Sequence, residues 1–296
     1  MAGLQTPAIL AALKTQLFKD FQDAMKETPV FSTRIGMFTE FPSAHGMNTY
    51  AWLAQLPHMR EWVGPRYIES LKERVFQISN KDYERTVGVS RNDLDDGNVA
   101  NASMAMQGLS VAAAKLADDL AIELLQTGHA IPCYDGQFLF DTDHPIDLDS
   151  SGSQSNYSAS GLALSAANFQ TVRAAIASFK GENGKPFGFR VSHLIVPPAL
   201  EKTALEICNA ESVATGGTNV QASYGVKVEV LSELAGQDTT WYAMDLVSPG
   251  PKALILQRRK SPTFVSLTDD RDENVFHRKE YLFGVDARFG AGPGIW

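Results

Sequence analysis

Residues 99–127 read VANASMAMQGLSVAAAKLADDLAIELLQT, and this stretch predicts the element around which the rest of the chain is organised. Its apolar residues recur at spacings of three and four, so one face of a helix carries them. They are Met106, Leu109, Ala113, Leu116, Leu120 and Leu124. Asp and Asn residues before Val99 are typical of a helix start, and Gly128 is typical of a helix end. A helix over Val99–Thr127 is about 40 Å long at 1.5 Å per residue. Because this exceeds the average globular helix, the stretch predicts a structural spine.

Two strands are predicted just before the spine, in ERVFQISNKDYERTVGVSR (residues 73–91). Side chains alternate between two faces on either side of a polar turn at residues 80–82. The residues that share a face are Phe76 and Ile78 in the first run and Arg85, Val87 and Val89 in the second.

The N-terminal stretch MAGLQTPAILAALKTQLF predicts an amphipathic helix with Pro7 near its start. The apolar positions at helical spacing are Leu10, Leu13, Leu17 and Phe21. A signal peptide is not indicated, because the stretch lacks a basic segment and a small-residue cleavage site. No apolar run approaches the roughly 20 residues that cross a bilayer, so we expect no membrane contact.

After the spine, helical and strand patterns alternate, which favours a mixed α+β chain. A helix capped by Ser165 is followed by the buried strand SHLIV and by a helix starting at Pro197–Pro198. Strand-like runs recur at VKVEVL, TWYAM, ALILQ and TFVSL. The closing run VFHRKEYLFGVDARF alternates at Tyr281, Phe283 and Val285, and we expect it to return and pair with earlier strands.

Charge and cysteine content exclude several classes of protein. The 296 residues carry a formal net charge of -8, whereas domains that wrap nucleic acid usually have a basic excess. Any contact with DNA should therefore be local and weak. The two cysteines, Cys133 and Cys208, lie far apart and predict neither a disulfide framework nor a CxxC pair, which favours a reducing compartment.

The stretch CYDGQFLFDTDHP, residues 133–145, has the residue types of a reactive centre. Asp141, Asp143 and His144 could serve a metal or an acid/base pair, but they lie too close in sequence to complete a metal site without distant ligands. The other reading is a rigid turn in which Asp side chains cap backbone N–H groups before the His144–Pro145 step. Cys133 has no adjacent base, and we expect it to be buried. The turn is favoured, with no catalytic, cofactor-binding or metal-binding residue.

Three further motifs favour structural roles. The spacing of GENGKPFG, residues 181–188, differs from that of a phosphate-binding loop and indicates a turn. The acidic TDDRDEN, residues 268–274, lacks the glycine and terminal glutamate of a calcium loop and indicates a capping turn. The basic run at residues 258–260 is too short for a nucleic-acid footprint and indicates a solvated strand end.

A strongly apolar segment lies within TYAWLAQLPHMREWVGPRYIES, interrupted by Pro57 and by Gly64–Pro65. Its large apolar residues are Trp52, Leu53, Leu56, Met59, Trp62 and Val63. One reading is a hairpin packed on its own core. The other is an arm that buries these side chains against a neighbouring subunit.

Several blocks together resemble one family of phage proteins. They are MREWVG, CYDGQFLFDTDHP, ALSAANF, KGENGKPFG, VPPALE, GGTN and TDDRDENVFHRKEYLFGVDAR. They are similar to the Mu-like prophage major head subunit family, known as gpT, from about residue 59 to the C-terminus. The order of predicted elements also resembles the major capsid proteins of tailed phages.

The resemblance implies an α+β fold of the type named after Hong Kong phage 97. Carried onto this chain, it implies the following parts: an N-terminal arm at 1–45, an extended E-loop at 46–78, a P-domain with the spine helix at 79–164, an A-domain at 165–256, and a return to the P-domain at 257–296. The E-loop would place Trp52 and the other apolar residues of its segment at a subunit interface. The family has no catalytic residues to transfer, and the 133–145 stretch would be a structural connection.

The implied function is a major capsid protein of the virion, assembled in the host bacterial cytoplasm into an icosahedral shell around double-stranded DNA. The implied partners are further copies in hexamers and pentamers, together with scaffold, portal and decoration proteins, and DNA held by weak non-specific contact. Two alternatives stay open at this point. One is a metal-assisted hydrolase using Asp141, Asp143 and His144, and the other is a neck or tail structural subunit.

Overall fold

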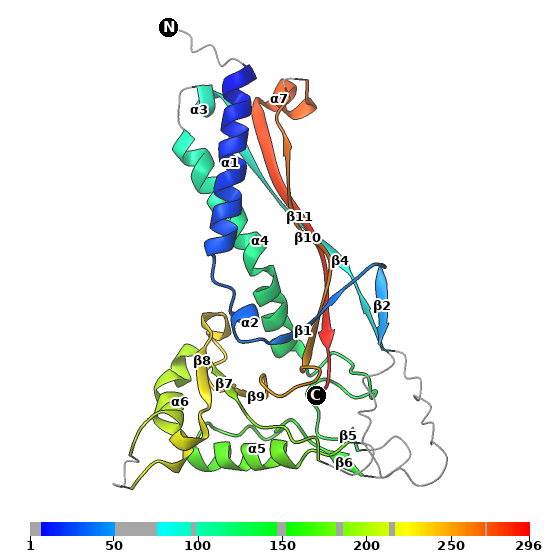
Figure 1. Ribbon diagram of the computed structural model, residues 1–296, viewed down its shortest axis with the longest axis vertical. Helices are drawn as coiled ribbons and strands as arrows, with labels where there is room; N and C mark the ends of the chain where they lie inside the picture. The colour runs from blue at the N-terminus through cyan, green and yellow to red at the C-terminus, as the bar shows by residue number, and fades with distance from the viewer. Residues whose placement is uncertain are drawn as a thin grey trace.

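The computed structural model of the protein describes residues 7–50, 76–95, 99–146, 152–181, 186–212, 217–269 and 271–296. The molecule is elongated (Figure 1). Its long part, here called the spine region, contains α1, α4 and a four-stranded sheet, and its basal region contains α5, α6 and a smaller sheet. Among the described helices, none has both the length and the apolar character needed to span a bilayer.

The predicted spine is helix α4, Val99–Thr127, with the bounds expected from the sequence. Helix α1, Pro7–Glu27, runs along it (Figure 1) and starts at the predicted proline. Leu17 and Phe21 of α1 are buried in one cluster with Met106 and Leu109 of α4. Gly128 follows the helix and packs against the Phe140 ring. A Cβ atom on Gly128 would lie 2.6 Å from that ring, so a residue with a side chain would force Phe140 to move.

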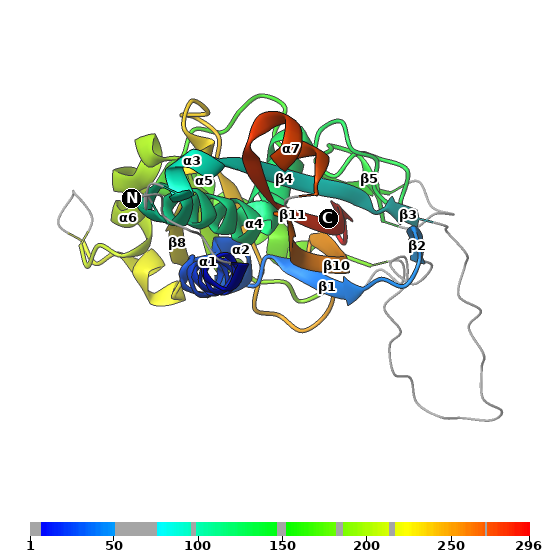
Figure 2. The same ribbon diagram turned by 90° about the horizontal axis from the view of Figure 1, so that it is seen from above.

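The sheet of the spine region has the order β1-β10-β11-β4. Its strands are β1 Phe38–Pro42, β4 Lys81–Ser90, β10 Leu254–Leu267 and β11 Glu280–Pro293. Strand β1 is parallel to β10, and the other two pairs are antiparallel. The closing run returns as predicted, with Tyr281, Phe283 and Val285 buried against the helices. Seen from above (Figure 2), α1 and α4 lie side by side next to this sheet, and β2 lies on the side away from them.

Strand β10 differs from the prediction, because the runs ALILQ and TFVSL form one strand. The boundary expected between residues 256 and 257 therefore falls inside a strand. The register shifts twice between Arg258 and Thr263, and the bulged section accommodates Pro262, which could not donate to a regular ladder.

The basic run at residues 258–260 is partly or fully exposed, as predicted, but it lies inside β10 and not at a strand end. Each cation contacts a different segment. Arg258 forms a bidentate ion pair with Glu40 of β1. Arg259 donates to the carbonyls of Ser43 and Ala44, and Lys260 pairs with Asp286 of β11. These partners were not predicted because they are distant in sequence.

Strands β2, Met47–Tyr50, and β3, Phe76–Ser79, form a two-stranded antiparallel ribbon. The two strands predicted before the spine are β3 and β4, but only Asn80 separates them, and they pair with different partners. The apolar segment from Trp52 to Val63 lies outside the described residues.

The basal region contains the predicted alternation of helices and strands. Its elements are α5 Ala166–Ser178, β7 His193–Val196, α6 Glu201–Cys208, β8 Lys227–Val230 and β9 Tyr242–Met244, with 3-10 turns at Pro198–Leu200, Val220–Tyr224 and Ser232–Leu234. Ser165 caps α5 as predicted by accepting a hydrogen bond from the Asn168 N–H at 3.2 Å. Strand β7 lies between β8 and β9, and its four residues are all buried.

A short helix, α2 Phe31–Arg34, connects the two regions. The buried Asp118 carboxylate of α4 accepts hydrogen bonds from the backbone N–H groups of Phe31 and Ser32, at 3.1 and 2.9 Å. Arg34 forms a bidentate pair with Glu229 of β8. The remaining short elements are α3 Arg91–Asp95, β5 His144–Pro145, β6 Ser153–Gln154 and α7 Glu273–Arg278.

Candidate functional site

The stretch 133–145 begins with a tight turn that its own backbone closes. The Cys133 N–H donates to the Gln137 carbonyl at 2.7 Å, and Gly136 adopts a φ of 92°, which only glycine reaches without strain. The Asp135 carboxylate accepts from the Gln137 N–H at 3.1 Å. The chain then runs back beside the end of α4, with the Leu139 N–H donating to the Ile131 carbonyl at 2.9 Å.

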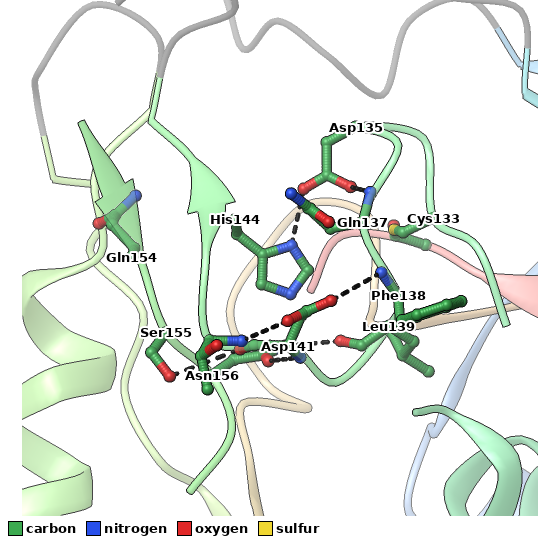
Figure 3. Close-up of polar contacts among 12 residues, drawn as sticks. Cys133, Asp135, Gln137, Phe138, Leu139, Asp141, His144, Gln154, Ser155 and Asn156 are labelled. Carbon is green, nitrogen blue, oxygen red and sulfur yellow. Dashed lines mark hydrogen bonds and ion pairs between the residues drawn. The ribbon is translucent and has the colours of Figure 1, made fainter. Parts of the chain in front are cut away.

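His144 is fully buried and faces Asp135. Its Nδ1 atom lies 2.7 Å from Oδ2 of Asp135, whose side chain is 3% exposed (Figure 3). The imidazole stacks on the Trp296 indole, with ring centroids 4.1 Å apart and planes 14° apart. Phe179, which follows α5, packs against the same indole edge-on at 5.4 Å. His144 therefore joins the loop after the spine to the C-terminal strand and the basal region.

Cys133 and Gly294 complete this joint. The Cys133 thiol donates to the Gly294 carbonyl at 3.4 Å, and burial raises the pKa of the thiol. A Cβ atom on Gly294 would lie 2.1 Å from the Lys252 carbonyl oxygen, so only glycine fits. We call Cys133, Asp135, His144, Gly294 and Trp296 the basal clasp.

Asp141 and Asp143 lie in the same loop but are not part of the basal clasp. Asp141 accepts hydrogen bonds from the backbone N–H groups of Thr142 and Phe138, at 2.7 and 3.3 Å (Figure 3). These bonds, with the Thr142 N–H the stronger influence, lower the pKa of Asp141. The hydrogen bond to Asp141 raises the pKa of Asp143. Asp141 is half-buried, whereas Asp143 is exposed.

Asn156 fixes this part of the loop from the other side. Its side chain accepts from the Asp141 N–H at 2.9 Å and donates to the Leu139 carbonyl at 2.7 Å (Figure 3). Pro145 lies in the two-residue strand β5, which pairs with β6. The polar groups around Asp141 are thus used to hold backbone in place.

The three residues proposed for a hydrolase do not converge on a cleft. His144 is inaccessible to solvent, so it cannot act on a dissolved substrate, whereas Asp141 is half-buried and Asp143 is exposed. A hollow of about 730 Å³ lies over α6, and its lining includes Pro198, Leu205 and Glu206 but none of the three. Within the described ranges, no group of three His, Cys, Asp or Glu residues is placed to hold a metal ion.

Sequence reasoning selected His144 but missed its partners. Asp135 is the third carboxylate of the same motif, so the motif itself offered Asp135 as a partner for His144. Trp296 and Gly294 lie more than 100 residues away, and no local pattern connects them to His144.

Comparisons with known proteins agree with this reading. The model of the Mu-like prophage major head subunit gpT family matches residues 10–163, 157–233 and 220–296. The chain is 30% identical over 291 residues to the Mu-like prophage FluMu major head subunit of Haemophilus influenzae and, equally, to the major capsid protein of Escherichia phage Mu. Each alignment covers 98% of this chain and 72% of the relative.

Solved structures show the same likeness. The chain superposes on a procapsid chain of bacteriophage JBD30 with a TM-score of 0.57 and 30% identity, covering 98% of this chain and 73% of that one. For a JBD30 capsid chain the values are 0.58 and 28%, with 78% and 99% covered. A capsid-type fold is therefore shown, as the α+β prediction expected.

The family is structural, so the hydrolase alternative is not supported, and the relatives are head rather than neck or tail proteins. An elongated subunit without a converging polar cleft among its described residues fits that role. From its sequence match along almost the whole chain and its fold, the chain belongs to the Mu-like prophage major head subunit gpT family, and it is a major capsid protein of a tailed phage that forms the shell of the virion.

Proposed function

We propose that copies of this chain join into the shell through the segment between β2 and β3, which corresponds to the E-loop implied by the family. The observation that supports this is topological. Tyr50 and Phe76 are directly paired across the β2–β3 ribbon, so the 25 residues between them begin and end at the same place on the subunit. In the sequence, these residues include Trp52, Trp62 and the other large apolar residues of the segment.

The β2–β3 ribbon, where this segment begins and ends, is held to the rest of the subunit by hydrogen bonds and buried apolar side chains. Asn80 donates through Nδ2 to Ser43 Oγ at 2.9 Å and to the His45 carbonyl at 2.8 Å. Its backbone N–H donates to the Gly46 carbonyl at 2.9 Å. Tyr50 and Ile78 are buried with Ile255 of β10. A fixed base presents the segment to a neighbour in a defined direction, which lowers the entropic cost of the contact.

The test is to replace Trp52 and Trp62 by alanine, singly. We expect nearly unchanged thermal unfolding of isolated subunits and a much lower yield of shells by sedimentation and electron microscopy, because each buried large side chain contributes about 1.5–3 kcal/mol per contact. Trp241→Ala is the matched control. Trp241 donates to the Leu162 carbonyl at 2.6 Å within the basal region, so its loss should lower subunit melting. Variants of Trp52 and Trp62 that unfold as monomers or assemble normally would contradict the proposal.

We further propose that the five parts implied by the family apply to this chain, and that the subunits form hexamers and pentamers with scaffold, portal and decoration partners. A solved JBD30 capsid, which is 29% identical to this chain, is decorated with minor capsid protein trimers. Packaged DNA should be held by weak, non-specific contact because the chain is acidic, with a net charge of -8. Duplex DNA titrated onto purified subunits should bind weakly and less with added salt, and tight binding at physiological salt would contradict this.

The 133–145 stretch should act as structural support for the shell subunit, with Asp141, Asp143, His144 and Pro145 fixing a turn. The hydrogen bonds of Asp141 to backbone N–H groups support this role. Elemental analysis should find no stoichiometric zinc, manganese or calcium that Asp143→Ala removes. A metal lost with that substitution would contradict the proposed role.

A further inference from the structure

The distal end of the β10–β11 ribbon carries apolar side chains that a single copy leaves in solvent. Helix α7 lies at this end, near the start of α1 and α3 (Figure 1). Phe276 of α7 is 77% exposed, and Val265 and Leu267 of β10 are 51% and 50% exposed. We call these three residues and α7 through Lys279 the distal tip.

Phe276 projects from a helix that is well anchored. Val275, beside it, is 2% exposed and belongs to the cluster that includes Phe283. The Lys279 N–H donates to the Val275 carbonyl at 3.2 Å, and the Arg91 N–H donates to the Lys279 carbonyl at 2.8 Å. An anchored, exposed aromatic side chain is the type of group that dominates contacts between proteins, because little entropy is lost when it is buried.

The charged residues from Asp269 to Lys279, in and beside α7, are separated along the chain. The acidic end has Asp269, Asp272 and Glu273 with one cation, Arg271, and the basic end has His277, Arg278 and Lys279. This order also suits the dipole of α7 itself. The dipole accounts for the order of the charges, but it gives no reason for an exposed phenylalanine between them.

Lys279 has a backbone conformation that favours glycine. Its φ is 55°, and within the described ranges it is the single non-glycine residue with a positive φ. A glycine would end the helix there without strain. A lysine therefore retains backbone strain at the C-cap of α7, and such strain is found most often at functional and contact sites.

We propose that the distal tip is a contact surface for a second copy of this chain, in which the basic end of one tip meets the acidic end of the next and Phe276 is buried between them. This rests on the proposed function, because assembly brings the copies together. Such a contact joins two different patches, so repeated contacts can close into a ring. The charged side chains around Phe276 attract each other across the contact, so added salt should weaken the contact.

The first test is Lys279→Gly in the full chain. Relief of the positive φ should leave subunit melting unchanged or raise it, while shells should need about tenfold more subunit to reach half-maximal yield. Phe276→Ser should have the same effect on assembly with unchanged melting. Shell yields equal to those of the unmodified chain for both variants would overturn the inference.

The second test uses charge reversal in two chains. Arg278→Glu and Glu273→Arg should each reduce assembly alone, because like charges then meet, and an equal mixture of the two chains should recover it. A mixture that assembles no better than either chain overturns the inference. If the unmodified chain forms no shells, the proposed function fails. If it forms shells and every variant does the same, only the distal tip contact fails.

Discussion

The two ends of the β10–β11 ribbon differ sharply in how their apolar side chains are used. At the base, Ile255 and Leu256 are 0% exposed and Phe289 is 2% exposed. At the distal tip, Val265, Leu267 and Phe276 are at least half exposed. Both ends belong to the same pair of strands, so strand propensity does not explain the difference. What differs is how much of the strands the same chain covers. At the distal end the helices bury one face, with Tyr281 and Phe283, and leave the opposite face, with Val265 and Leu267, open.

At the base of the ribbon, apolar side chains are buried within the subunit, because the loop after the spine and the basal region both pack there. The distal tip has apolar surface left over, and a protein made to exist in many contacting copies can place that surface against a neighbour. With the distal tip as the proposed contact surface, the fold would separate the residues that stabilise the subunit from those that join subunits. Changes at the base should affect folding of the subunit, and changes at the distal tip should affect joining of subunits.

The largest effect is expected from Gly294→Ala. The added Cβ would lie 2.1 Å from the Lys252 carbonyl oxygen, which is backbone and cannot move aside cheaply. We expect a loss of about 4 kcal/mol or more in the free energy of unfolding, measured by urea denaturation. Gly108→Ala is the matched control. No atom would lie within 4 Å of its Cβ, and it is inside α4, so it should stabilise by up to about 1 kcal/mol. An unchanged free energy of unfolding for Gly294→Ala would show that the backbone at the base is not tightly packed.

A smaller but still large effect is expected from Asp135→Ala. This change leaves the fully buried His144 without the carboxylate at 2.7 Å, and we expect a loss of about 3 kcal/mol in the free energy of unfolding. Asp143→Ala, ten residues before β6 in the same loop, removes an exposed carboxylate and should change stability by about 0.5 kcal/mol or less. Equal losses from both changes would mean that the basal clasp is no more important than the loop surface.

The smallest effect concerns thiol reactivity. Burial raises the pKa of Cys133 and raises that of Cys208 from 9.0 to about 11. The folded state therefore favours the neutral thiol, so the contribution of Cys208 to stability is complete below about pH 9 and is lost as the pH rises toward 11. At pH 8 a disulfide reagent should react slowly with both thiols. A cysteine introduced by Val265→Cys at the distal tip should react fast. Equally fast reaction of all three would remove the contrast between the two ends.

The sequence predicted the parts of the fold that depend on local pattern. The bounds of α4 follow from a long apolar stripe and Gly128, and the Ser165 cap follows from a side chain that bonds three residues ahead. The partners of the Arg258–Lys260 run, Glu40 and Asp286, were not predicted because they are distant in sequence.

The candidate site was predicted less completely than the fold. His144 was selected with Asp141 and Asp143, its neighbours in the chain, whereas its contacts are Asp135 and Trp296. The stacking on Trp296 depends on β11 returning beside the loop after the spine. A single sequence has no signal for that juxtaposition, because it arises from packing between segments about 150 residues apart.

The contrast between the two ends of the ribbon is tested most directly by amide hydrogen exchange, measured on isolated subunits and on assembled shells. We expect the amides of residues 263–269 and 271–279 to become protected on assembly, since neighbours cover the distal tip. The amides of residues 133–145 and 252–257 should be protected already in the isolated subunit and change little. Protection gained at the base with none gained at the distal tip would contradict the account.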